Sequence, residues 1–549
     1  MAKDMNHARL QFARLKTPVK SGELLIEPSG DGLLAMAESN RALLRSYSFA
    51  VLDLNVSDVR AEFRRTMCDG CDEPAVITGH QPEFIHAGVW AKHVVAARLA
   101  EVLGGKAINL VVDNDAPKQG GLEVVTCVDG GVGAETVACG ALEPGRAYES
   151  IRPLDDRACE ALASRVRRLM GERFERTCMS DFLSGLRGGV GTGDWVDQMV
   201  FARREVEGRF GVAMIEHRVS RVWAGPMLGD LICNAERFAA CYNEALARYR
   251  AEHRVRGVNR PIPDLMRGAG RCEVPVWVYR LGGPRRRLFV ERAGDTVRLF
   301  AGTEGMSPAG SPATPIAEMA AGELETWESA ERALMGRTEF VIRPRALSLT
   351  LWARVLVGDL FIHGIGGAKY DRITDDIIRR YYGVEPPGMG CVSATLRACD
   401  APHEIDEDTL RAARRRVRDM RFNPQRYVGN GGETADMVAR RERAVAESRR
   451  LAKESAHDRS GRREVFERIR RISEALLEGN RDVLRRSEDA AFETERKLAD
   501  IERARRRDYF FAMMDRVSLE RLRDTLVSAV TVGAVGVGEQ GRAAVRRKS

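Results

Sequence analysis

The chain has 549 residues, which is too long for one compact core and predicts roughly three to four structural units. Hydrophobic residues make up 44% of it, no apolar run reaches the roughly 18 residues of a membrane span, and the N-terminus lacks a secretion-signal pattern, so we expect a cytoplasmic protein without membrane contact. The net charge of +8 lies largely in arginine-rich helical segments, where such side chains usually face the solvent. We therefore expect that the protein does not bind nucleic acid.

Cysteine usage indicates reduced thiols. The 11 cysteines are an odd number without a regular framework, and only Cys68 and Cys71 form a CxxC pair. A zinc ribbon needs a second ligand pair at suitable spacing, and none follows. We therefore expect a loop with two incidental thiols and no metal motif.

Residues 1–150 are predicted to hold an N-terminal segment that packs onto the core, followed by the first part of that core. An apolar run at 75–78 predicts a buried strand, and a helix follows over about 89–103, ended by two glycines. A second apolar run at 107–112 predicts another strand. Strand, helix and strand with short connections are typical of a parallel sheet.

Residues 151–330 are predicted to form an inserted connective region. Helices rich in arginine and glutamate, such as 156–170 and 229–250, alternate there with strand-like runs at 274–279 and 287–290. A stretch rich in Gly, Pro, Ser and Thr at about 302–315 indicates a boundary loop near the end of the region.

Residues 331–402 return to the α/β pattern and predict the second part of the core. A helix over about 346–356 precedes a strand at 359–363, a glycine loop at 364–367 and a helix at 374–382. The core is therefore predicted to be split around the insertion.

Residues 403–527 predict a helical coiled-coil arm, and 528–549 a disordered basic tail. Apolar residues recur there in steps of about three and four, which is typical of a coiled coil or a long helical hairpin. We expect the arm to form a homodimer. The apolar residues of this seam are Val465, Ile469, Ile472, Leu476, Val483, Leu498 and Ile501.

Polar side chains follow three of the predicted strands, where an open parallel sheet binds its ligands. The first cluster holds His80, Gln81, His86, Gly88, Lys92 and His93, and the second holds Asp113, Asn114 and Asp115. The third holds His363, Gly364, Gly366, Gly367, Lys369, Tyr370 and Asp371. We predict that these clusters share one crevice, with His80, Gln81, Asp113, Asp115 and His363 closest to the chemistry.

Each cluster also has a structural explanation. The glycine loop either lets a backbone approach an anion, with Lys369 adding charge, or is a tight turn without such a role. The histidines either transfer protons near neutral pH or make structural hydrogen bonds. The two aspartates either bind substrate or cap the next segment.

The order of these segments resembles that of the bacillithiol synthase family, ligases that add cysteine to glucosaminyl malate. The likeness covers most of the chain. It rests on Ile77 to Gln81 with Gly88 to Lys92, Asp113 to Asp115, Arg343 with Pro344, Leu360 to Tyr370, Pro386 with Pro387, and Ser393 to Leu396. The resemblance implies a Rossmann-like, nucleotidyltransferase-like core with an inserted connective domain, a dimerising coiled coil, and a substrate-binding role for Arg343.

Two departures from the family concern the substrate. His80 stands where the family has glutamine, and His363 to Gly367 replace a Gly-Gly-Pro-Gly-Glu loop. The resemblance therefore implies a divergent ligase that joins an amine- or thiol-bearing, cysteine-like molecule to an aminosugar-type acceptor, with a nucleotide such as ATP or ADP as a conceivable cofactor. Nucleotidyl transfer on the same fold and a non-catalytic coiled-coil assembly protein stay open as alternatives.

Overall fold

The structure is a computed structural model that describes residues 15–68, 70, 72–128, 131–140, 142–223, 225–255, 262–302, 314–334, 339–429, 431–454, 457 and 459–530. Cys71, most of the predicted boundary loop at 302–315 and nearly all of the predicted basic tail lie outside these residues. The chain forms two compact units: residues 1–125, 135–398 and 507–549 make up the first, and residues 126–134 and 399–506 the second.

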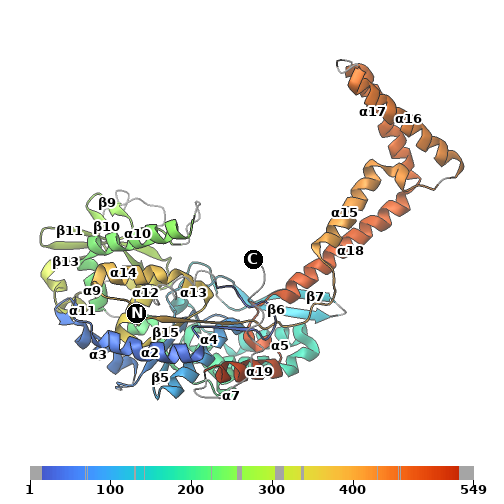
Figure 1. Ribbon diagram of the computed structural model, residues 1–549. Coiled ribbons are helices and arrows are strands. Elements are labelled where there is room, and N and C mark those ends of the chain that lie inside the picture. The colour runs from blue at the N-terminus through green and yellow to red at the C-terminus, as the bar shows by residue number, and fades with distance from the viewer. Residues whose placement is uncertain are drawn as a thin grey trace. The chain divides into compact units, whose positions relative to one another are not determined.

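A six-stranded mixed sheet, called sheet A, forms the centre of the first unit (Figure 1). Its strand order is β1 (Leu24–Glu27), β16 (Met389–Ala394), β15 (Leu360–His363), β4 (Ala75–His80), β5 (Lys106–Val111) and β8 (Ile215–Arg218). The last five of these run parallel, whereas β1 is antiparallel to β16. Sheet A therefore departs from the predicted parallel sheet in one strand, the antiparallel edge strand β1.

The inner strands are continuous apolar runs because both of their faces are covered. All residues of β15 and β16 are buried. Helix α4 (Ala87–Val102) crosses from β4 to β5 and packs against both strands and β16. It is buried on almost every side. Its few polar side chains therefore contact other parts of the protein or line a cleft, and do not face bulk solvent.

The direction of the chain through sheet A changes between β4 and β15. From β4 the chain moves outward to β5 and later to β8, and it then returns to the other side of β4 to form β15 and β16. In open α/β sheets, the crevice at such a switch point, outside the carboxyl ends of the strands, is the usual place for a ligand.

A second sheet in the first unit is antiparallel throughout. Its strands, in spatial order, are β13 (Ala317–Ala320), β12 (Thr296–Gly302), β11 (Arg286–Ala293), β10 (Arg271–Tyr279) and β14 (Val341–Pro344), and β9 (Arg267–Gly268) pairs with β10. This is the small sheet predicted from the runs at 274–279 and 287–290. Strand β14 then leads the chain back to sheet A.

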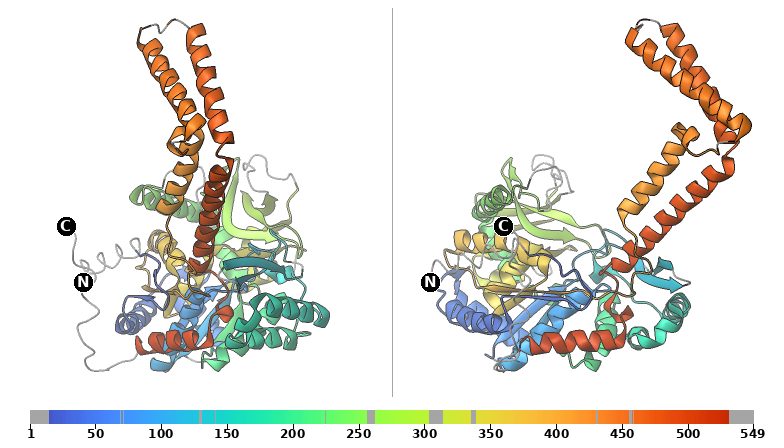
Figure 2. Two further views of the ribbon diagram at one scale, coloured as in Figure 1. Left: turned by 90° about the vertical axis from the view of Figure 1, so that its right-hand side faces the viewer. Right: turned by 45° about the vertical axis from the view of Figure 1, so that its right-hand side comes forward.

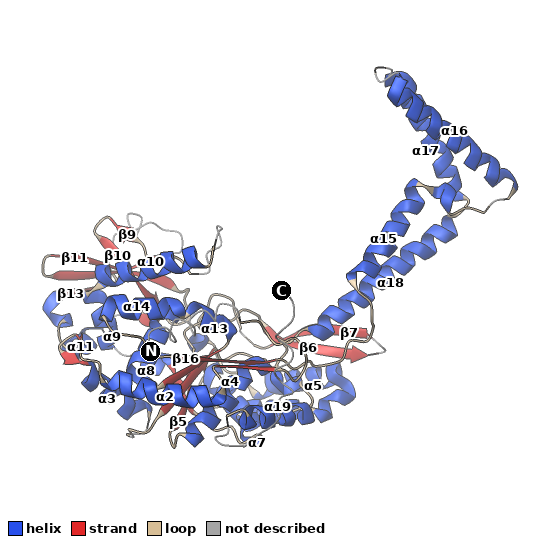
Figure 3. Ribbon diagram, viewed as in Figure 1, coloured by secondary structure: helices blue, strands red, loops and turns tan. Residues whose placement is uncertain are grey.

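Helices and short strands complete the first unit, as Figure 3 shows in blue and red. The helices are α2 (Gly30–Arg45), α3 (Val56–Met67), α5 (Asp156–Met170), α6 (Met179–Gly188), α7 (Trp195–Arg209), α8 (Val219–Val222), α9 (Gly225–Cys233), α10 (Ala235–Glu252), α11 (Trp327–Leu334), α12 (Ala346–Trp352), α13 (Ile365–Tyr370), α14 (Arg372–Tyr382) and α19 (Arg516–Ser528). Two small hairpins are β2 (Ala50–Val51) with β3 (Leu54–Asn55), and β6 (Gly121–Val128) with β7 (Gly131–Ala138), whose tip belongs to the second unit.

The second unit is mainly helical. It contains α15 (Glu407–Phe422), α16 (Gly432–Glu454), α17 (Arg459–Glu478) and α18 (Arg481–Arg505). Helix α15 packs along α18, and α16 along α17, so that Figure 2 shows two antiparallel pairs. Of the predicted seam residues, Val465, Leu476 and Ile501 are buried. Within the described residues, no helix combines the length and the hydropathy that a membrane span requires.

Four boundaries differ from those predicted. Residues 341–344 were expected in the second part of the core, but they form β14 of the antiparallel sheet. Residues 215–218 were expected inside the insertion, but they form β8 of sheet A. Residues 507–527 were expected in the arm, but they belong to the first unit, where α19 packs against α4. The predicted glycine loop at 364–367 is largely helical, because α13 starts directly after Gly364.

A buried carboxylate fixes the beginning of β15 against β4. Asp359 accepts hydrogen bonds from Arg60 (2.6 Å), Arg64 (3.2 Å) and the backbone N–H of Ala75 (2.8 Å). The side chain of Asp359 is only 2% exposed, and both arginine side chains are at most 10% exposed. Removal of the carboxylate charge would leave two buried guanidinium groups without compensation.

We predict that Asp359→Asn lowers the free energy of unfolding of the first unit by about 3–5 kcal/mol. All six tryptophans lie in the first unit, so urea unfolding followed by tryptophan fluorescence reports on it alone. Glu328→Gln is the matched control, because Glu328 pairs with Arg332 on the exposed surface of α11. An unfolding midpoint that is the same for both variants would contradict the prediction.

Candidate functional site

A cleft of about 1120 Å³ opens at the carboxyl ends of the parallel strands of sheet A, at the switch point between β4 and β15. All of its lining residues belong to the first unit. The predicted site residues that line it are His80, Gln81, His86, Gly88, Lys92, Asp115, His363, Gly364, Gly366 and Gly367. The clusters near residues 80–115 and 363–367, far apart in the sequence, therefore share one cavity, as predicted.

Four predicted site residues lie outside this lining: Asp113, Arg343, Lys369 and Tyr370. Asp113 is fully buried and binds Arg218 (2.8 Å) and the backbone N–H of Ser220 (2.9 Å), so it fixes the end of β8. Arg343 makes two hydrogen bonds of 2.9 Å to Glu149. Both residues are occupied by structural ion pairs, a role different from the substrate contact that we expected.

His86 has a structural role at the start of α4. Its Nδ1 accepts a hydrogen bond of 3.0 Å from the backbone N–H of Gly88, so that His86 is the N-cap of the helix. Burial, and next the charge of Arg507, lower the pKa of His86 to about 4. The ring is therefore neutral at neutral pH and carries its hydrogen on Nε2.

Gly88 is required because an arginine packs onto it. A Cβ atom at position 88 would stand 2.2 Å from Nη2 of Arg507 and 2.8 Å from the carbonyl oxygen of Ala394. Arg507 donates to Oγ of Ser393 (3.0 Å), and its Nη1 is buried and finds no hydrogen-bond partner among the described residues. A guanidinium group with an unused buried donor thus faces the cleft.

Lys92 brings a second cation to the same region. It is 4% exposed, and its Nζ donates to the carbonyl oxygen of Gly79 (2.8 Å). No carboxylate pairs with it among the described residues. Burial lowers the pKa of Lys92 to about 8, so the side chain is charged below that pH and neutral above it.

His80, Gln81 and Asp115 line the cleft beside Lys92. Gln81 donates to Asp115 (2.8 Å), and Arg285 donates to the other oxygen of the carboxylate (2.7 Å). Burial raises the pKa of Asp115, but Arg285 and Gln81 outweigh it and lower the pKa. Burial, with Lys92 nearby, lowers the pKa of His80 well below its usual value, so that His80 is neutral.

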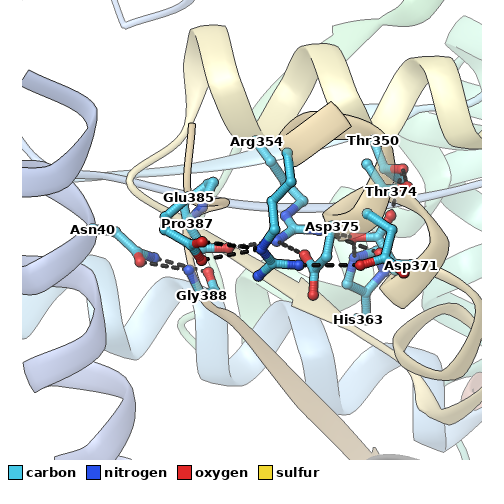
Figure 4. A network of polar contacts seen from close by, with 12 residues as sticks. Asn40, Thr350, Arg354, His363, Asp371, Thr374, Asp375, Glu385, Pro387 and Gly388 are labelled. Atoms are coloured by element: carbon cyan, nitrogen blue, oxygen red, sulfur yellow. Dashed lines mark hydrogen bonds and ion pairs between the residues drawn. The ribbon is translucent and has the colours of Figure 1, made fainter. Parts of the chain in front are cut away.

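His363 ends β15 and leads into a buried polar network (Figure 4). Its Nε2 lies 2.9 Å from Oδ2 of Asp371. Arg354 donates to the same oxygen (2.7 Å), and Thr350 donates to Oδ1 (2.7 Å). Arg354 also binds Asp375 (2.7 Å). It comes from a π-helical turn, Ala353–Val357, a rare geometry that is frequent at functional sites.

The second sheet contributes a cationic wall. The guanidinium groups of Arg285 and Arg345 lie 4.9 Å and 4.4 Å from the ring centre of Trp277. Arg345 (2.8 Å) and Arg287 (3.3 Å) share the fully buried carboxylate of Glu273. The single negative charge of Glu273 is thus shared by two positively charged arginines.

His93 does not belong to the cleft. It follows Lys92 in the chain, but successive residues of a helix point about 100° apart. Its ring lies 2.6 Å from Glu207, which also binds Arg203. Of the three histidines between 80 and 93, only His80 and His86 therefore line the cleft.

The charges around the cleft favour an anionic ligand. Glu273 lies behind the lining, and even when it is counted, cations outnumber carboxylates. The cations that line the cleft are Lys92, Lys118, Arg285, Arg287, Arg345 and Arg507, and the carboxylates are Asp115 and Asp508. Sequence reasoning missed Arg507 and Arg345. Arg345 follows the noted Arg343-Pro344 pair directly, whereas no local pattern marks Arg507.

No protein-family model matches the chain, and no curated protein matches it significantly.

We predict that the cleft binds sulfate more weakly as the pH rises through about 8, because Lys92 then loses its charge. Sulfate keeps its own charge over this range, so the change reports on the protein. Loss of one charged hydrogen bond weakens binding by about tenfold or more between pH 7 and pH 9.5, as measured by calorimetry.

Lys92→Gln should bind weakly at both pH values. Lys106→Gln is the matched control, because Lys106 lies at the opposite end of its strand and pairs with Glu73. Equal pH dependence in the Lys92→Gln variant and the control would contradict the assignment.

Proposed function

We propose that the cleft is the active site of a divergent ligase similar to the bacillithiol synthases. It would join an amine- or thiol-bearing, cysteine-like molecule to an aminosugar-type acceptor. In this proposal sheet A is a Rossmann-like core, and the antiparallel sheet corresponds to the connective domain.

One observation carries the proposal: segments that resemble the family, although far apart in the chain, contribute residues to the same cleft. His80 and Lys92, Asn114 and Asp115, Pro344, His363 to Gly367, and Ser393 all line it. The resemblance rests on the residues, order and spacing of these segments and not on their places in the fold, so their convergence is independent support.

The charges of the cleft fit such substrates. A carboxylate or another anionic group of the acceptor would lie near Lys92 and Arg507, which have unused capacity for an anion. The wall that contains Trp277, Arg285 and Arg345 would hold a second polar group. Catalysis would come mainly from positioning and from stabilisation of developing negative charge.

We predict that the purified protein, given cysteine, glucosaminyl malate and ATP, forms a product with the mass of cysteine plus acceptor less one water. Arg507→Gln should lower kcat/KM by roughly ten- to a hundredfold, because it removes a charged donor to the acceptor. Arg523→Gln, on the outer helix α19, is the control.

Two other outcomes of this assay are decisive. No condensed product from the wild-type protein would contradict the ligase assignment. Release of pyrophosphate with transfer of a nucleotide, in the absence of condensation, would instead support nucleotidyl transfer. In cells, deletion of the gene should remove a low-molecular-weight thiol from the metabolite profile.

We further propose that the second unit forms a homodimer. Three phenylalanines stand on its surface, Phe422 (66% exposed), Phe466 (64%) and Phe492 (70%), an unusual exposure for aromatic side chains. Replacement of Phe466 and Phe492 by glutamate should convert a dimer to a monomer in sedimentation at micromolar concentration. Leu281→Glu, an equally exposed apolar position in the first unit, is the control. A wild-type monomer would contradict the proposal.

A further inference from the structure

The tautomer of His363 follows from its bond to Asp371. Asp371 is 2% exposed, and burial alone would raise its pKa, but Arg354 and His363 hold the pKa well below its usual range. An ionised carboxylate can only accept hydrogen bonds. Nε2 of His363 must therefore carry the hydrogen, which leaves the lone pair of the neutral ring on Nδ1.

Nδ1 of His363 is not used by a hydrogen bond among the described residues. His363 lines the cavity, and no described residue makes a hydrogen bond to its Nδ1. Gly367, one turn along in α13, is close to this atom, since a Cβ atom at position 367 would stand 2.7 Å from Nδ1. Glycine at this position keeps the lone pair accessible.

The carboxylate beside the ring of His363 would stabilise a proton on the ring. Arg354 pairs with two carboxylates, Asp371 and Asp375, and the ring of His363 lies 2.9 Å from the first of them. A protonated ring would therefore lie in direct contact with a carboxylate, which would stabilise its charge. Lys92 from α4 also approaches this end of β15, since its Cδ lies 4.0 Å from where a Cβ atom of Gly364 would stand.

We propose that His363 is the general base of the cleft and that Asp371 is its positioning residue. A bound substrate lies with its N–H or S–H group against Nδ1. That bond breaks and the proton moves to Nδ1, while the electron pair left on nitrogen or sulfur forms a bond to the carboxyl carbon of the second substrate, which ATP has activated. The bond from that carbon to its phosphate or nucleotide leaving group breaks. The imidazolium, stabilised by Asp371, later returns the proton to the leaving group or to water. The identity of the attacking group rests on the proposed function. The geometry of His363 and Asp371 is independent of that function.

Nitrogen NMR of the full-length protein with ¹⁵N-labelled histidine tests the arrangement without any substrate. The signals of His363 are identified by their absence in His363→Gln. We expect the tautomer with its hydrogen on Nε2 to dominate over the one with its hydrogen on Nδ1, and a loss of this preference in Asp371→Asn. A wild-type ring with its hydrogen on Nδ1 would overturn the proposal.

Two glycines provide a matched pair for the same measurement. A methyl group at position 367 would press on Nδ1, whereas one at position 366 meets no atom within 4 Å. Gly367→Ala should shift the ring signals of His363, and Gly366→Ala should leave them in place. The pair also keeps the proposal falsifiable if Asp371→Asn does not fold. Identical spectra for the two alanine variants would count against an open Nδ1.

Kinetics with cysteine and glucosaminyl malate supply the second test. Asp371→Asn should lower kcat about a hundredfold or more with little change in KM, because it disorders the base and leaves the binding groups intact. An unchanged kcat would overturn the role of Asp371. If the wild-type protein does not turn over these substrates, the ligase proposal fails, while the NMR result still decides whether His363 is arranged as a base.

Discussion

The parallel pairing of β4 with β15 is the constraint on which the rest of the molecule depends. Phe361 pairs with Ile77, and Thr78 donates a hydrogen bond of 2.9 Å to the carbonyl oxygen of Ile362. Asp359 fixes the start of β15 to α3 and β4 through buried charge. Because these two strands are separated by almost the whole insertion, one short register decides that His80 and His363 face the same cavity.

The regular part of this architecture could be predicted from the sequence because its signals are strong. Central strands such as β5 are mostly apolar, and α4 was expected over 89–103 and lies over Ala87–Val102. Edge strands are different. β8 reads Ile-Glu-His-Arg, and its side chains make polar contacts, so no apolar pattern marks it. Its assignment to sheet A depends on the register with β5, which only tertiary structure shows.

The candidate site was predictable where a strand end and a chemical side chain coincide in sequence. His80, Gln81 and His363 were found in this way. Asp113 and Arg343 have the same local signature, yet their charges are taken up by Arg218 and Glu149, partners far away in the chain. Arg507 shows the converse. It follows the whole helical arm, and its place over Gly88 depends on packing that no local pattern encodes.

The burial of Lys92 without a counter-ion has a thermodynamic consequence for any anion that enters the cleft. An anion beside the ammonium group would raise its pKa from about 8 toward the ordinary value. Between those two values the free side chain is neutral and the liganded one is charged. Ligand and proton would then be taken up together, and the observed heat of association would depend on the ionisation enthalpy of the buffer.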